Sequence, residues 1–115
     1  MKHDVIVIGG SYAGMASALQ LLRARKDVLV IDAGVRRNRF ASHSHGFLGQ
    51  DGADPAEIAT KARRQLEAYP TLNWVDGVAV AVAGERDRFF VATSDGSIHN
   101  GRRVLFATGV IPSLR

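Results

Sequence analysis

Residues 4–14 read DVIVIGGSYAG, and this stretch decides the fold of the chain. The β-branched run at residues 5–8 predicts a strand buried on both faces, as in a parallel sheet. Apolar residues then recur at helical spacing from Met15, and the VLVI run at residues 28–31 predicts a second buried strand. Strand, helix and strand within about 30 residues predict a βαβ unit with a right-handed crossover.

The glycines between the first strand and the first helix predict a dinucleotide site. Against the pattern GxGxxG, Gly9 and Gly14 match, while Ser11 replaces the middle glycine. The pattern requires a tight turn, backbone amides that face a pyrophosphate, and close packing of the helix on the strand. Asp32 ends the second strand, where a carboxylate accepts hydrogen bonds from a ribose diol, which favours FAD or NAD over NADP. The alternative is a turn that merely needs glycine, but strand, glycines, helix, strand and acid occur here in order.

A long loop and a second helix are expected after this unit. Residues 35–53 are rich in Gly, Ser, His and Asn, and an irregular segment of this length in a compact domain is usually functional. Asp54 suits a helix N-cap, Pro55 the first turn and Glu57 the capping box. Pro70 is expected to close this helix.

The last third of the chain changes to an antiparallel pattern. We expect a β-meander over about residues 76–100, with an Asp-Gly hairpin signal at residues 95–96. Residues 104–107 predict a last buried strand. The predicted fold class is therefore α/β, a Rossmann-like parallel sheet with a small antiparallel β-meander. Trp74, Phe89 and Phe90 are expected in the core, and His3 and His99 at the surface.

Composition excludes several classes of protein. The 115 residues make one domain, and 46% hydrophobic with 23% charged residues is typical of a globular chain. No apolar run is long enough for a signal peptide or a membrane span, so we expect a cytoplasmic protein. The net charge of +4 is spread along the chain, so we expect no nucleic-acid partner. Without cysteine, these residues hold no disulfide or thiolate zinc site, and no metal site is expected.

Residues 4–14 resemble the FAD-binding start of the thioredoxin reductase-like flavoproteins, of the pyridine nucleotide-disulfide oxidoreductase type. Residues 37–52 resemble a loop of a subgroup of that family, and the predicted meander has the expected place. Residues 107–109, ATG, match the motif that ends the first FAD segment of the family. The resemblance covers residues 3–110. It implies that residues 1–115 are part of an FAD-binding domain, without the NAD(P)H domain and the C-terminal FAD segment of the longer family members.

The resemblance implies FAD as the cofactor and NAD(P)H as the electron donor of the full-length family. Arg37, Asn38 and His45 would contact FAD from the long loop, and Val80 would offer its backbone to the adenine. The implied cofactor-binding residues are Gly9, Gly10, Ser11, Tyr12, Ala13, Gly14, Asp32, Arg37, Asn38, His45, Val80, Ala107, Thr108 and Gly109. No residue is a convincing acid, base or nucleophile, so we assign no catalytic residue and expect no turnover by this chain alone.

Two other interpretations stay open. The chain could be a non-catalytic or truncated dinucleotide-binding module, for FAD or NAD, that acts with another chain. An NAD-binding Rossmann domain is a third interpretation, which the long loop and the meander disfavour. If residues 104–107 lie beside the first strand, their outer edge is unpaired, and an apolar edge strand promotes association. We therefore expect poor solubility or a homodimer formed through that edge.

Overall fold

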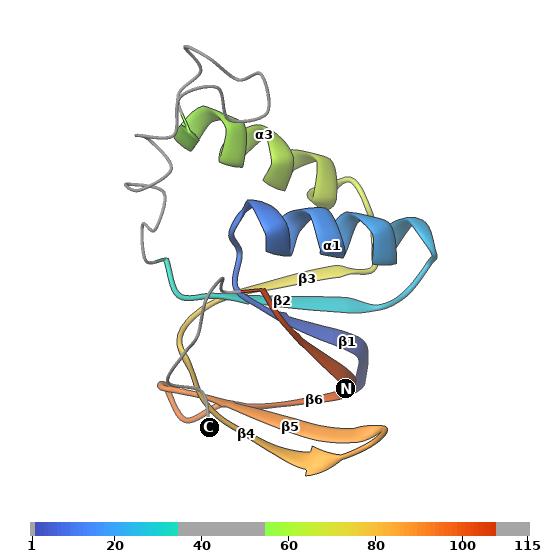
Figure 1. The fold of residues 1–115 in the computed structure, drawn as a ribbon, viewed down its shortest axis with the longest axis vertical. Coiled ribbons are helices and arrows are strands. Elements are labelled where there is room, and N and C mark those ends of the chain that lie inside the picture. The colour runs from blue at the N-terminus through green and yellow to red at the C-terminus, as the bar shows by residue number, and fades with distance from the viewer. Residues whose placement is uncertain (1, 35–54, 108–115) are drawn as a thin grey trace.

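The computed structural model describes residues 2–34 and 55–107. These residues form one sheet and two helices, arranged as an α/β fold (Figure 1). In chain order the elements are β1 (Lys2–Ile8), α1 (Tyr12–Arg23), β2 (Val28–Asp32), α3 (Pro55–Glu67), β3 (Leu72–Asp76), β4 (Ala79–Glu85), β5 (Arg88–Thr93) and β6 (Ile98–Phe106).

The sheet combines the two predicted strand patterns. Its strand order is β3-β2-β1-β6-β5-β4. The first four strands in this order are parallel, and β6, β5 and β4 form an antiparallel meander. The register of the βαβ unit pairs Val5 with Val28 and Ile8 with Ile31. The predicted Rossmann-like sheet with a small meander is therefore confirmed.

The two central parallel strands, β1 and β2, are buried on both faces. Helices α1 and α3 lie on one side of them and the meander on the other (Figure 1). Val7 of β1 packs toward Leu22 and Leu66 of the two helices. Its neighbour Ile6 packs on the opposite face with Val91 of β5. Because successive strand residues point to opposite faces, a strand covered on both sides needs an unbroken apolar run.

The second helix forms within the described residues much as expected. Asp54, the predicted N-cap, lies outside them. Helix α3 ends at Glu67, three residues before Pro70, and its Leu66 is buried against α1 and the sheet. Arg63 of α3 stacks over Trp74 of β3, with the guanidinium carbon 4.2 Å from the ring centroid. This cation–π contact links the helix to the edge strand of the sheet.

The last strand is longer than the sequence indicates. We predicted a separate strand at residues 104–107, but β6 runs without a break from Ile98 to Phe106. It pairs in parallel with β1 and antiparallel with β5. Gly101 makes this continuity possible, because a Cβ there would lie 2.7 Å from Cγ1 of Ile6. Pairing of β6 with β1 is confirmed. The pairing of β6 with β5 ends at Gly101, and none of the described strands pairs with the outer edge beyond it.

Three predictions about burial were wrong. The strand predicted to be buried at residues 104–107 is largely exposed, with Leu105 and Phe106 38% and 43% exposed. Phe90 is 46% exposed, because it alternates with the buried Val91 and faces away from the sheet core. His3 is only 6% exposed, because its ring is held by Asp27 in a polar network. Trp74, Phe89 and His99 are half-buried.

Candidate cofactor-binding site

The predicted site lies where the carboxyl ends of β1, β2 and β6 meet the start of α1 (Figure 1). Two backbone hydrogen bonds hold the segments together. Gly9 donates its amide to the carbonyl of Ile31 at 2.8 Å, and Ala107 donates its amide to the carbonyl of Ile8 at 2.9 Å. This edge of a parallel sheet is where α/β folds bind their ligands.

Gly9 and Gly14 meet the two steric demands of the glycine pattern. Gly9 has φ of 114°, a conformation that residues with a side chain rarely adopt. A Cβ at Gly14 would overlap the carbonyl oxygen of Gly9 and lie 3.3 Å from the Cβ of Ala107. The helix therefore approaches the loop and β6 as closely as backbone atoms allow.

Gly10 leaves room for the side chain of Asp32, the residue predicted to bind a ribose. A Cβ at Gly10 would lie 2.6 Å from Cγ of Asp32. The half-buried Asp32 accepts a hydrogen bond from the Gly34 amide at Oδ1, at 3.3 Å. Its other carboxylate oxygen takes no hydrogen bond from the described residues. The absence of a side chain at Gly10 thus lets the Asp32 carboxylate lie directly beside the glycine loop.

Ser11 begins α1 and orients its first turn. It is the N-cap residue, with φ −68° and ψ 175°, and its hydroxyl accepts from the amide of Gly14 at 3.4 Å. No acidic residue lies in the first turn of α1, which is described in full. Tyr12 and Ala13 open this turn and are exposed. The positive end of the helix dipole therefore meets no negative side chain within its own first turn, which favours an anion such as a pyrophosphate.

The structure brings together part of the predicted site. The residues it gathers at this edge are Gly9, Gly10, Ser11, Tyr12, Ala13, Gly14, Asp32 and Ala107. Val80 lies on β4 and is 60% exposed, three residues after Gly77, whose amide donates to the carbonyl of Asp32 at 2.8 Å. The remaining predicted residues lie outside the described residues: Arg37, Asn38, His45, Thr108 and Gly109.

Sequence reasoning missed one contact in the site. The Ser11 hydroxyl donates to the carbonyl oxygen of Ala107 at 2.9 Å, across 96 residues of sequence. No local pattern signals this bond, because it depends on β6 lying beside β1. The one sequence feature that relates to this bond is the serine at position 11, where the glycine pattern has its middle glycine.

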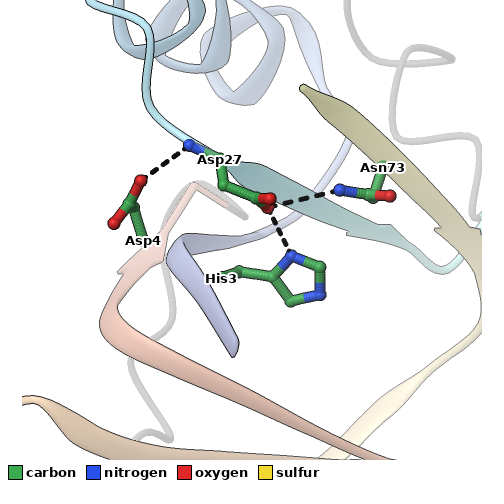
Figure 2. A network of polar contacts seen from close by, with 4 residues as sticks. All are labelled: His3, Asp4, Asp27 and Asn73. Atoms are coloured by element: carbon green, nitrogen blue, oxygen red, sulfur yellow. Dashed lines mark hydrogen bonds and ion pairs between the residues drawn. The ribbon is translucent and has the colours of Figure 1, made fainter. Parts of the chain in front are cut away.

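Other polar groups lie away from this edge. His3, Asp4, Asp27 and Asn73 form a network at the opposite end of the parallel strands (Figure 2). Asp87 and Asp95 have lowered pKa values, caused first by hydrogen bonds from Arg103 and from Thr93 respectively, and both lie at turns of the meander. Among residues 2–34 and 55–107, no three His, Asp or Glu side chains group as metal ligands. No described helix is long and apolar enough to cross a membrane.

The fold is of the Rossmann-like, nucleotide-binding class. A family profile described as "Pyridine nucleotide-disulphide oxidoreductase" matches residues 3–114, and the chain belongs to this family. Within the family it is thioredoxin reductase-like. The family uses FAD and NAD(P)H.

Individual relatives agree with this assignment. The chain is 33% identical over 119 residues to a probable thioredoxin reductase of Arthroderma benhamiae, with 98% of this chain and 30% of the relative covered. It is 34% identical over 110 residues to thioredoxin reductase tcpT of Claviceps purpurea, with 93% and 34% covered. The chain thus spans about a third of the length of these relatives.

A solved structure is similar as well. An oxidoreductase from Agrobacterium tumefaciens superimposes with a TM-score of 0.88 at 57% identity, covering 96% of this chain and 38% of that one. The backbone arrangement of the described residues is therefore shared with an experimentally determined relative.

Proposed function

We propose that this chain is the FAD-binding N-terminal portion of an NAD(P)H-dependent thioredoxin reductase-like flavoprotein. The observation that carries the proposal is the juxtaposition of Gly10 and Asp32 at the start of α1. A ligand with a ribose diol and a pyrophosphate fits the carboxylate and the helix N-terminus at the same time. Family membership supports FAD as that ligand.

Different residues of the site would contact different parts of the cofactor. Backbone amides at the start of α1 would face the pyrophosphate, with Gly9 allowing the tight turn and Gly14 the close packing of the helix on the loop. Asp32 would accept hydrogen bonds from the adenosine ribose through its carboxylate. Ala107, at the end of β6, would approach the cofactor from the strand on the other side of the loop. All these roles are binding and orientation.

The chemistry that FAD held at this site would supply is hydride acceptance from NAD(P)H and electron transfer to a disulfide or another acceptor. None of the described residues at the site is placed as an acid, base or nucleophile. We therefore expect this chain to bind and position FAD, and we expect no turnover by the 115 residues alone.

Equilibrium dialysis with FAD tests the proposal. Replacing Asp32 by Ala removes the ribose acceptor, so we expect FAD affinity to fall about tenfold to a hundredfold, as for the loss of one or two charge-assisted hydrogen bonds. Asp76→Ala is the matched control, because Asp76 ends the neighbouring strand β3 and is exposed. Equal FAD affinity for the Asp32 variant and the parent chain would contradict the assignment.

A parallel dialysis with NAD separates the proposal from its rival. The FAD assignment requires that the parent chain bind FAD more tightly than NAD. Tighter binding of NAD, lost in the Asp32→Ala variant, would identify the chain as an NAD-binding module instead.

A further inference from the structure

The hydrogen bond between Ser11 and Ala107 fixes the distance between two sides of the site. Ser11 donates from its hydroxyl to the carbonyl of Ala107 at 2.9 Å. Ala107 is also bonded through its amide to Ile8 and packed against Gly14, and it is 8% exposed. The end of β6 is therefore held by β1, by the glycine loop and by the first turn of α1.

The strand order gives this bond a place relative to the ligand. In the sheet, β1 lies between β2 and β6. Asp32 ends β2 and Ala107 follows β6, so the two residues flank the glycine loop on opposite sides. A dinucleotide with one ribose at Asp32 and its pyrophosphate at α1 has its second half on the β6 side. A mononucleotide such as ADP ends at the pyrophosphate and does not reach that side.

A glycine in the middle position of the pattern has no hydroxyl and could not make this bond. The Ser11 hydroxyl has two partners, because it also accepts from the amide of Gly14 at 3.4 Å. One side chain thus connects the turn that faces the pyrophosphate with the backbone that borders the second half of the ligand.

We propose that Ser11 is a positioning residue for the flavin half of FAD, which it sets by holding Ala107 against the glycine loop. This inference rests on the proposed function. It separates the role of Ser11 from that of Asp32, since Asp32 acts on the adenosine half that FAD shares with ADP.

Dissociation constants for FAD and ADP, measured side by side, test the inference. For Ser11→Ala we expect FAD binding to weaken about tenfold, the effect of one lost hydrogen bond, and ADP binding to change less than about twofold. Ser11→Thr keeps a hydroxyl suited to an N-cap and should restore FAD affinity. Ser17→Ala, in the same helix, is the control and should leave both constants unchanged.

The outcomes are distinct. Loss of FAD and ADP affinity by the same factor would show that Ser11 acts only as a helix cap, and would overturn the inference. Unchanged FAD affinity in Ser11→Ala, or no recovery in Ser11→Thr, would also overturn it. If the parent chain binds ADP and not FAD, or neither, the proposed function itself fails, whatever the variants do.

Discussion

The carboxylate of Asp27 lies 2.6 Å from Nδ1 of the buried His3, and this pair joins the beginnings of β1 and β2 (Figure 2). Asn73 of β3 donates its side-chain amide to the same carboxylate oxygen at 3.3 Å. The Asp27 amide in turn donates to Asp4 at 2.8 Å. One residue thus connects three neighbouring parallel strands at the end of the sheet remote from the glycine loop.

Removal of this carboxylate should lower stability and leave cofactor binding intact. We expect Asp27→Ala to reduce the free energy of unfolding by about 1–2 kcal/mol, because the ring of His3 and the amide of Asn73 both lose a hydrogen-bond partner. Asn73→Ala removes only one of these bonds and should cost less. Urea unfolding measures both changes. Equal stability of Asp27→Ala and the parent, or a loss of FAD affinity, would contradict this account.

The closest contact in the glycine loop gives a sharper stability test. Gly14→Ala places a methyl group on the carbonyl oxygen of Gly9, so backbone atoms must move. Overpacking of this kind costs about 1–3 kcal/mol. Gly77→Ala is the control, because its Cβ would lie 3.6 Å from the nearest side-chain atom, an ordinary contact.

Urea unfolding midpoints of the two glycine variants should therefore separate clearly. The Gly14 variant should unfold at lower urea than the parent, and the Gly77 variant close to it. Equal midpoints for the two variants would show that the loop accommodates a methyl group at position 14, and would contradict the predicted clash with Gly9.

The sequence predicts the βαβ unit because its signals are local. The apolar run at residues 5–8, the glycines that follow and Asp32 at the end of the second strand each reflect a demand of one turn or one strand. The Asp-Gly signal of the hairpin is local as well, because Gly96 has a positive φ of 92° that glycine adopts readily. These elements, and the gathering of the glycine loop with Asp32, could be predicted without coordinates.

Features that depend on distant partners could not be predicted. His3 carries a polar side chain near the chain start, and only Asp27, 24 residues away, explains its burial. The sequence predicts a separate strand at residues 104–107, yet β6 continues through Gly101, where it passes close to Ile6. The bond from Ser11 to Ala107 likewise needs the strand order before it can be seen.

The contribution of the turn between β5 and β6 to the stability of the fold should decrease at acidic pH. A hydrogen bond from the Thr93 hydroxyl and the amide of Ser97 hold the pKa of Asp95 below its usual value of 3.8. A carboxyl with a lowered pKa in the folded state stabilises the fold above pH 3.8, and this stabilisation is lost as the pH falls through the lowered value.

Asp95→Asn should therefore melt at a lower temperature than the parent near pH 7. The difference between the two melting temperatures should shrink below about pH 4 as Asp95 of the parent takes up a proton. Thermal melts over a series of pH values measure this. A difference that is constant from neutral to acidic pH would contradict the assignment.

The outer edge of β6 beyond Gly101 should promote self-association of the chain. Leu105 and Phe106 are 38% and 43% exposed there, and no described strand pairs with this edge. We expect elution in size-exclusion chromatography to shift toward a larger species as concentration rises, and Leu105→Lys to suppress the shift, because edge charges oppose strand pairing.

Ile98→Lys is the matched control for this edge. Ile98 is 60% exposed and lies on the part of β6 that β5 already pairs, so the same added charge should leave association unchanged. A parent chain that stays monomeric over a wide concentration range would refute the prediction.

The most direct test of the central claim is the visible absorbance spectrum of the chain after incubation with FAD and desalting. We expect retained flavin bands in the parent chain. We expect their loss in Gly10→Leu, whose side chain would occupy the space between the loop and Asp32. A parent chain that emerges colourless, or a Gly10→Leu variant that keeps its flavin, would contradict the assignment of the glycine loop as an FAD site.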